Sequence, residues 1–394
     1  MKRGFNINMD LLEGLNLNNT FITNIGEKIY PIEKYLQICN EQFSQKIHNK
    51  QLPLFYENPI CAQLELTNKC NQFCKHCYNQ SGDSTKKQDL TVEEWKQIAH
   101  QIGKLGVYEC VISGGEPTLM GDSLFEIMDI LHSYDINFVF ITNGMLLNQD
   151  VLNKLKKYRY NWLQVSIDGS RPYLHNYVRG VDSFERVITA ANLVKLNGFP
   201  LVIAHAVVKK NLEYVEEMID TAYLLGAVRI VAGAFNFTGR AIVNSEELDL
   251  MDEERKQLYK IIHKKAKEYA GSMQISIALE DVTSLRINLI APNSVILIRP
   301  NGDIKTDCIS PFKIGNVKDQ DLKSIWDSLG KYVNCHPKVL EYVSKIKSCK
   351  DMLSVFPRVN VDENELLPPI REEDIFGPIN LRNYRNPNTV KEVC

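Results

Sequence analysis

Strong charge imbalance and long apolar runs are both missing from this chain of 394 residues. Its 46 basic and 48 acidic residues give a formal charge of -2, so a nucleic-acid-binding stripe is not expected, and the basic runs at 156–159 and 263–267 are typical of solvated helix faces. No stretch of about eighteen apolar residues is present. The amino-terminal sequence MKRGFNINMDLL also lacks the apolar region of a signal peptide. We therefore expect a cytoplasmic protein that binds neither nucleic acid nor membrane.

Cysteine is scarce as well, with ten residues that are too unevenly spaced for a disulfide scaffold. Three of them nevertheless lie close together, since Cys70, Cys74 and Cys77 fall within LELTNKCNQFCKHCYNQ. Three thiolates on one turn suit an iron-sulfur cluster, which normally takes four cysteines. This spacing therefore predicts a cluster with one iron open to another ligand.

Two other interpretations of these cysteines are available. A zinc site needs a fourth ligand, and the only nearby candidate, His76, lies between two of the cysteines. The cysteines could instead be packed in the core, because a cysteine outside a disulfide behaves as a small hydrophobe. The loop is too polar for a packed core, since it carries Asn68, Lys69, Asn71, Gln72, Lys75 and Asn79.

Apolar runs and helical patterns alternate regularly from Cys61 onward. Six strand-like segments lie between Gln63 and Ala234, and each but the last is followed by a helical pattern before the next. This order predicts an α/β fold with parallel strands and right-handed crossovers. After a helix at about 248–270, the segments QISIALE, SVILIRP and NGDIKTD predict short antiparallel strands, with Asn301 and Gly302 as a hairpin turn.

Short motifs follow four of the predicted strands. The cysteine loop follows the first strand, GGEP at 114–117 the second, Thr-Asn-Gly at 142–144 the third, and SxDG at 166–169 the fourth. The carboxyl ends of parallel strands meet at one edge of a sheet, where active sites of such folds are found. We therefore expect the four motifs to lie together.

The cysteine spacing, GGEP and SxDG resemble the motifs of radical SAM enzymes. The resemblance implies a partial, six-stranded (β/α)6 TIM-like barrel. It also implies that Cys70, Cys74 and Cys77 hold a [4Fe-4S] cluster, whose open iron is chelated by S-adenosyl-L-methionine (SAM). Reductive cleavage of SAM would give a 5'-deoxyadenosyl radical that abstracts hydrogen from a substrate carbon. The electron would come from a donor such as flavodoxin or ferredoxin.

The resemblance further places SAM against particular residues. Gly114 and Gly115 let the backbone approach the methionine amino group, and Glu116 suits a charge-assisted hydrogen bond there. The remaining assignments are polar or aromatic side chains in or near the motifs: Asn143, Ser166 and Asp168 for the ribose and methionine portions, His76 and Tyr78 near the adenine, and Arg179 towards the carboxylate.

Structural roles stay open for several of these side chains. Asn143, Ser166 and Asp168 also suit ordinary turns and caps. Arg179 also suits an exposed position, and His205 on the fifth predicted strand suits a satisfied position in the cavity wall.

Residues 294–328 resemble the SPASM/twitch extension of peptide-modifying radical SAM enzymes, on the hairpin, Cys308, the Gly315 and Asn316 turn, and Trp326. The resemblance implies that the substrate is a ribosomally synthesised precursor peptide. It would receive a carbon-carbon or thioether cross-link, or be epimerised at an alpha carbon.

The extension departs from that resemblance in its cysteines. Such extensions carry many, whereas Cys308, Cys335, Cys349 and Cys394 are the only ones after Cys110. Two auxiliary clusters are excluded, and the spacing does not favour even one. Cys308, Cys335 and Cys349 are therefore candidate catalytic residues, as hydrogen donors to a substrate radical or as ligands of one auxiliary cluster; each is equally suited to a buried apolar position.

We expect four regions in all. They are an appended segment at 1–58, with a helix at about 32–47 that caps the barrel or contacts a leader peptide, the barrel at 59–245, the extension at 246–350 and a tail at 351–394. Two rival functions remain open. One is a radical SAM enzyme acting on a small molecule such as a porphyrin or a nucleoside, and the other is a non-catalytic iron-sulfur or zinc protein.

Overall fold

The computed structural model describes residues 45–46, 49, 51–53, 55–82, 88–279 and 281–370. Cys394 and most of the expected tail lie outside the described residues. The helix expected at about 32–47 also lies outside them, except for residues 45 and 46.

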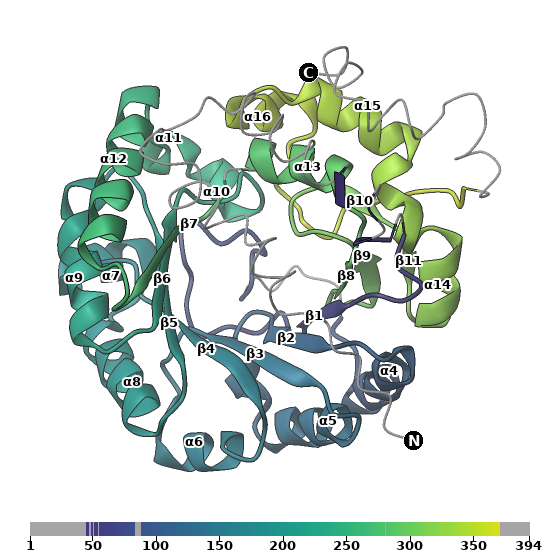
Figure 1. The fold of residues 1–394 in the computed structure, drawn as a ribbon, viewed down its shortest axis with the longest axis horizontal. Coiled ribbons are helices and arrows are strands. Elements are labelled where there is room, and N and C mark those ends of the chain that lie inside the picture. The colour runs from purple at the N-terminus through teal and green to yellow at the C-terminus, as the bar shows by residue number, and fades with distance from the viewer. Residues whose placement is uncertain are drawn as a thin grey trace.

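One ten-stranded sheet organises the fold, in the order β11-β9-β8-β1-β2-β3-β4-β5-β6-β7 (Figure 1). From β8 to β7 in this order, every pair of neighbours is parallel. The parallel strands predicted between Gln63 and Ala234 are thus confirmed. Their bounds are β1 (Cys61–Glu65), β2 (Glu109–Ser113), β3 (Asn137–Thr142), β4 (Tyr160–Ser166), β5 (Leu201–Ala206) and β6 (Arg229–Gly233), flanked by β7 (Gln274–Ile277) and β8 (Val295–Ile298).

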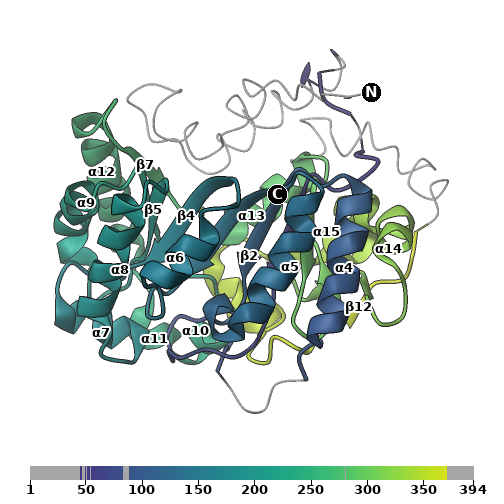
Figure 2. The ribbon, with the colours of Figure 1, turned by 90° about the horizontal axis from the view of Figure 1, so that it is seen from below.

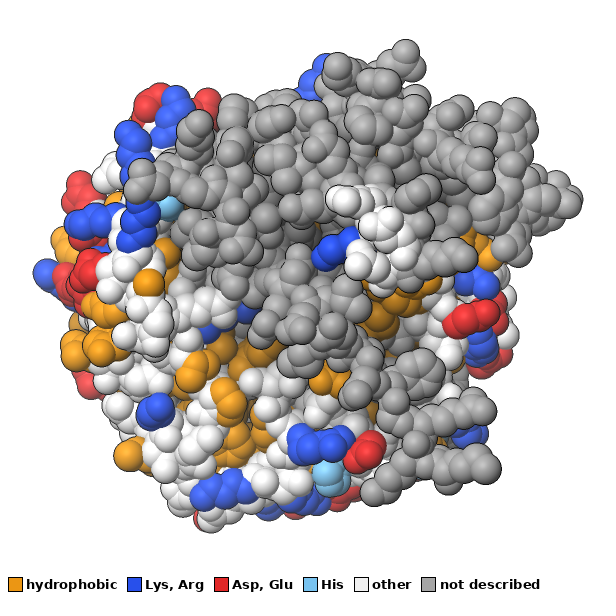
Figure 3. All heavy atoms as spheres, viewed as in Figure 1, with side chains coloured by type: hydrophobic (Ala, Val, Ile, Leu, Met, Phe, Trp, Pro, Cys, Tyr) orange, Lys and Arg blue, Asp and Glu red, His pale blue; other side chains and the backbone are white. Residues whose placement is uncertain are grey.

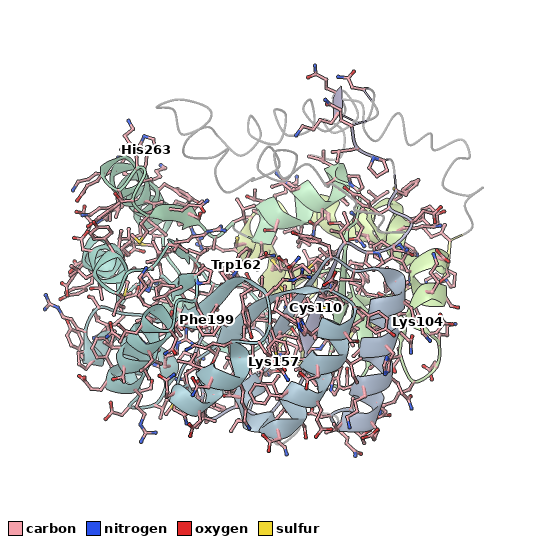
Figure 4. All side chains as sticks on the ribbon, turned by 60° about the horizontal axis from the view of Figure 1, so that its bottom comes forward. Lys104, Cys110, Lys157, Trp162, Phe199 and His263 are labelled. Atoms are coloured by element: carbon pink, nitrogen blue, oxygen red, sulfur yellow. The ribbon has the colours of Figure 1, made fainter. Side chains whose placement is uncertain are left out.

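Helices cover the outer face of this sheet (Figures 1 and 2). Alternate strand residues such as Ala62 and Leu64 are fully buried in the layer between sheet and helices, where Cys110 also lies (Figure 4). This apolar layer holds the strands in register, so that their carboxyl ends form one edge. The helices are α4 (Val92–Leu105), α5 (Asp122–Ser133), α6 (Gln149–Leu155), α7 (Pro172–Arg179), α8 (Phe184–Leu196), α9 (Val215–Leu224) and α12 (Asp252–Glu268), with short turns η1 (Pro117–Met120) and η2 (Leu212–Tyr214).

The segment QISIALE, predicted as an antiparallel strand of the extension, is instead a parallel strand of the barrel sheet, whereas SVILIRP forms a strand that is parallel to one neighbour and antiparallel to the other. β7 pairs with β6 and β8 pairs with β1, so the sheet continues beyond its six central strands on both sides. Short apolar runs carry no signal for the direction of their partners, which explains the wrong prediction. The hairpin prediction is confirmed, because β8 and β9 (Asp303–Lys305) are antiparallel and Gly302 has a φ of 90°.

The carboxyl-terminal elements pack beside β8 and against α4 (Figure 1). Trp326 is fully buried there, and its Nε1 donates to the carbonyl of Tyr56 at 3.1 Å. The elements are α13 (Asp281–Ile290), β10 (Phe312–Lys313), β11 (Gly315–Asn316), α14 (Leu322–Ser328), η3 (Gly330–Cys335), α15 (Pro337–Lys345), η4 (Cys349–Asp351), α16 (Met352–Val355) and β12 (Glu365–Leu366). Two short helices, α10 (Arg240–Val243) and α11 (Ser245–Leu248), lie between β6 and α12 in the chain.

The described surface mixes both signs of charge. Basic and acidic side chains lie side by side at the rim of the face in Figure 3, as the near-neutral composition implies. Among the described helices, none is both long and apolar enough to cross a membrane.

Candidate functional site

A cavity of about 360 Å³ opens at the carboxyl ends of the barrel strands. The four motifs meet there, as expected from parallel strands. Of the residues predicted to bind the cluster or SAM, all but Glu116 line this cavity: Cys70, Cys74, His76, Cys77, Tyr78, Gly114, Gly115, Asn143, Ser166, Asp168 and Arg179, joined by His205.

The cysteine loop is held by the backbone of the GGEP turn. The amide of Gly115 donates to the carbonyl of Thr67 at 2.6 Å, and the amide of Glu116 donates to the carbonyl of Lys69 at 2.9 Å. A Cβ on Gly115 would lie 2.2 Å from the Lys69 carbonyl oxygen, and one on Gly114 would lie 2.8 Å from that of Thr67. The two glycines are therefore required by this approach of backbone to backbone.

The thiols of the loop are held in a way that suits a cationic metal centre. Burial raises the pKa of Cys74 to about 12, although the neighbouring Arg179 opposes this, and burial also raises the pKa of Cys70. Because thiolates rather than thiols bind metals, the loop needs strong positive charge to hold its thiols ionised. Among the described residues, no three His, Cys, Asp or Glu side chains form a group suited to one metal ion.

Several buried polar atoms in the cavity wall have no hydrogen-bond partner among the described residues. Buried polar groups nearly always have partners, so these atoms indicate a polar ligand. They fit SAM, which offers ammonium, carboxylate, hydroxyl and adenine groups. The atoms are His76 Nδ1, both amide atoms of Asn79, Ser81 Oγ, His205 Nε2 and Arg240 Nη1.

Glu116 does not have the position that the resemblance implied. It is fully buried behind the cavity, where its Oε1 accepts from Thr142 Oγ1 at 2.8 Å and its Oε2 accepts from the amide of Asn143 at 2.8 Å. Its carboxylate thus fixes the end of β3 rather than facing a ligand. The sequence could not indicate this, because the face to which a turn residue points depends on neighbouring strands.

The end of β3 in turn positions an amide next to the cysteine loop. Asn143 Nδ2 donates to Asn71 Oδ1 at 2.7 Å and lies 3.8 Å from Cys70 Sγ. A role in the turn alone therefore does not account for Asn143, because its side chain reaches both the cysteine loop and the cavity.

Asp168 and Arg179 form a buried ion pair at the cavity wall. Arg179 Nε lies 2.6 Å from Asp168 Oδ2, and His76 Nε2 lies 3.6 Å from the same oxygen. Burial opposes ionisation, but the charge of Arg179 outweighs it and lowers the pKa of Asp168 to about 2. Arg179 is only 8% exposed and its Nη1 lies 3.7 Å from Cys74 Sγ, so the exposed alternative is wrong.

His205 has one satisfied nitrogen. Its Nδ1 lies 3.1 Å from the carbonyl of Ile167 and donates to it, and burial lowers its pKa. The ring is thus a neutral part of the cavity wall.

Sequence reasoning missed Arg240, which follows β6. Its Nε donates to the carbonyl of Cys74 at 3.0 Å and its Nη2 to that of Ser81 at 2.9 Å, while the guanidinium stacks 3.8 Å from the ring of Phe73. The loop FNFTGRA was the available signal, and the short distance from Gly239 to the carbonyl of Tyr78 explains its glycine.

A buried chain of charges beneath the cavity was also missed. Tyr78 Oη donates to Glu65 Oε1 at 2.8 Å, Glu65 Oε2 pairs with Arg299 at 3.0 Å, and Arg299 pairs with Asp362 at 3.2 Å. The three charged residues are at most 5% exposed. Glu65 ends β1 and Arg299 follows β8, so strand pairing brings them together although they are far apart in the sequence.

The candidate catalytic cysteines of the extension lie in different environments. Cys308 Sγ is 3.6 Å from Nδ2 of Asn236, a cavity residue, and burial raises the pKa of Cys308 to about 12. Cys349 is buried in the main core, whereas Cys335 packs beside Tyr332. Of the three, Cys308 has the thiol nearest to the cavity wall.

Two family descriptions match the chain. Residues 64–222 match the radical SAM superfamily, and residues 290–351 match SPASM, an iron-sulfur cluster-binding domain.

Individual proteins are similar over much of the chain. An AdoMet-dependent heme synthase of Methanosarcina barkeri is 27% identical over 68% of this chain and 82% of its own length. The mycofactocin maturase MftC of Mycolicibacterium smegmatis is 30% identical over 51% of each chain. Among solved structures, SuiB of Streptococcus suis bound to SAM has a TM-score of 0.61 at 17% identity, covering 86% of this chain and 85% of SuiB. SuiB was also solved with its precursor peptide SuiA.

We predict that Arg299→Met lowers the free energy of unfolding by about 3–5 kcal/mol, because it breaks the buried ion pairs of Arg299 with Glu65 and Asp362. Urea unfolding under anaerobic conditions measures the change. The control is Lys256→Met, which removes an exposed pair with Glu253 and should leave the unfolding midpoint unchanged. Equal midpoints for Arg299→Met and the wild type would contradict the prediction.

Proposed function

Because its two domains match the radical SAM superfamily and SPASM, the chain belongs to the radical SAM superfamily, and we propose that it modifies a ribosomally synthesised peptide. Hydrogen abstraction from the peptide would lead to a carbon-carbon or thioether cross-link or to epimerisation. The similarity to the maturase MftC and the fold shared with SuiB, a protein solved with its precursor peptide, support this substrate class. The observation that carries the proposal is the meeting of three thiols, the GGEP backbone and unpartnered polar atoms in one cavity.

The cofactors are a [4Fe-4S] cluster and SAM, and together they supply hydrogen-atom abstraction through one-electron cleavage of SAM. We assign Cys70, Cys74 and Cys77 as the ligands of the cluster. The backbone at Gly114 and Gly115 and the side chains of Asn143 and Ser166 would orient SAM, since all four line the cavity beside the thiols. Four aromatic or charged side chains in the same wall would also orient SAM: His76, Tyr78, Asp168 and Arg179.

The ring of His76 stays neutral in this arrangement. Burial lowers the pKa of His76 to about 4, so it offers an uncharged flat surface, which suits the adenine. Asp168 and Arg179 add no net charge to the wall, because they pair with each other. This pair therefore adds no net positive charge that would oppose the sulfonium of SAM.

We also propose that the protein works in the cytoplasm and receives its electron from flavodoxin or ferredoxin. A reducing compartment would preserve the exposed iron of such a cluster. The four regions expected from the sequence likewise remain a proposal.

A small-molecule substrate is the second candidate. It is favoured by the heme synthase of Methanosarcina barkeri, whose length is covered more completely than that of MftC. Mass spectrometry separates the candidates after reaction with a porphyrin or with short peptides encoded beside the gene. A cross-link removes two hydrogen atoms from a peptide, and epimerisation in heavy water adds deuterium at an alpha carbon. Conversion of the porphyrin alone would overturn the peptide proposal.

We predict that the wild type releases 5'-deoxyadenosine when reduced with dithionite and that Cys70→Ala, Cys74→Ala and Cys77→Ala combined abolish this, because the variant has no cluster ligands at the site. Chromatography of the quenched reaction measures the product. The matched control is Cys110→Ala, which alters a thiol buried between sheet and helices and should retain product release. A wild type that binds iron but releases none would instead support the non-catalytic alternative.

The iron content of the same samples decides the question of an auxiliary cluster. The SPASM match favours one, whereas Cys308, Cys335 and Cys349 lie in separate environments. About four irons in the wild type, falling to none in the triple variant, would mean a single cluster. About eight irons falling to about four would mean an auxiliary cluster, and oxidative cross-linking would then become the leading reaction.

We predict that Gly115→Ala binds at least several-fold less iron after anaerobic reconstitution than the wild type. Its Cβ would meet the Lys69 carbonyl oxygen at 2.2 Å and displace the cysteine loop. Gly106→Ala is the control, since its φ of 69° is strained for alanine but no atom lies within 4 Å of the added Cβ. Full iron content in Gly115→Ala would show that the loop does not depend on this contact.

A further inference from the structure

Two glutamines face the lumen of the barrel at the end away from the thiols. Gln63 lies on β1 between Ala62 and Leu64, which are fully buried under the helices, so alternation turns Gln63 to the opposite face. Gln164 lies on β4 between buried Leu163 and Val165 in the same way. Both glutamines line the cavity.

Neither amide is engaged by another residue that the structure describes. Gln63 and Gln164 are partly exposed to the cavity, and neither side chain hydrogen-bonds to another described residue. This differs from Glu116 and Asn143, whose side chains are committed to neighbouring strands and loops. These two half-buried amides therefore present free donors and acceptors to the cavity.

Strand register places these amides below the cofactor end. Gln164 precedes Ser166 by one step on the lumen face, and Ser166 precedes the Asp168 loop. Gln63 pairs with Val111 of β2. Val111 lies two residues before Ser113, the last residue of β2 before the GGEP turn. The part of the wall that β5 and β6 contribute includes the uncharged residues Ala204, Val231 and Gly233.

The chemistry of this end is neutral. The Asp, Glu, Lys and Arg residues that line the cavity are Asp168, Arg179 and Arg240, and all three contact the cysteine loop or its immediate neighbours. A porphyrin carries carboxylates that would call for cations at the glutamine end. A peptide group, with one N–H and one C=O, matches a glutamine amide instead.

We propose that Gln63 and Gln164 bind successive peptide groups of an extended substrate segment and so present one of its carbons to the cofactor end. β1 and β4 are separated by β2 and β3, about 14 Å along the curved sheet. When both glutamine side chains extend into the lumen, the gap between their amides is short enough to be filled by one or two extended residues of a peptide substrate, at about 3.3 Å per residue. The inference rests on the proposed function, because it names the groups by which that site would hold a peptide.

The test uses the reconstituted holoenzyme with SAM and two small probes. One is N-acetyl-Ala-Ala N-methylamide, and the other is its depsipeptide, in which an ester oxygen replaces the central N–H. Ligand-observed NMR titration gives both dissociation constants without turnover. In the wild type, the amide should bind about 3- to 10-fold more tightly than the ester, as expected for one lost hydrogen bond.

Gln63→Met and Gln164→Met keep the length of the side chain but remove its amide. At least one of them should weaken binding of the amide probe by about 3- to 10-fold and bring the two probes to equal affinity. Gln97→Met, on the exposed face of α4, is the matched control and should bind as the wild type does. Equal affinities for amide and ester in the wild type, or an undiminished preference in both variants, would overturn the inference.

Iron content and melting temperature are measured on the same samples. If a methionine variant loses iron, Gln63→Asn or Gln164→Asn replaces it in the titration. Asparagine keeps an amide but is too short to reach the same peptide group, so the asparagine variant should show the same weakening of amide-probe binding. The outcome is separable from the proposed function. Amide-selective binding without 5'-deoxyadenosine release would refute the radical reaction alone, whereas peptide modification without amide selectivity would refute the glutamine assignment alone.

Discussion

The close contact of two backbone segments is the constraint on which the site depends. The cysteine loop after β1 reaches the GGEP turn after β2 so closely that Gly115 has no room for a side chain, and amides of the turn donate to carbonyls of the loop. These bonds connect the ends of adjacent parallel strands, so the barrel itself sets the position of the thiols. A loop fixed by its backbone leaves its side chains available for a cofactor.

Buried charged side chains also connect the cysteine loop to distant segments of the chain. Arg240 connects the cysteine loop to the segment after β6, and the chain from Tyr78 through Glu65 and Arg299 connects it to the end of β8 and to Asp362. Such groups are costly to bury unless every partner is in place. The carboxyl-terminal region is therefore connected to the cavity wall through these buried charges.

Sequence patterns predicted the parts of this protein that depend on local order. The alternation of strands and helices, the position of the four motifs at one sheet edge and the hairpin at Gly302 all follow from periodicity and turn chemistry. Patterns did not reveal that β7 and β8 join the barrel in parallel, since so short a strand segment is compatible with either direction. They also misplaced Glu116 and missed Arg299, because both roles arise from contacts between segments distant in the sequence.

The lumen is divided between two kinds of chemistry, and this division bears on the substrate. At the carboxyl ends of the strands, charges are paired and buried around the thiols, which suits an ionic cofactor that must be held in one orientation. One or two residues earlier on the same strands, the wall changes to the uncharged amides of Gln63 and Gln164 and to apolar side chains such as Ile141 and Val231. A neutral, extended chain gains hydrogen bonds there without losing solvation of any charge, whereas an anionic substrate would lose its solvation and find no cation in return. The energetics of desolvation thus favour a peptide over a carboxylated small molecule at the inner end of the cavity.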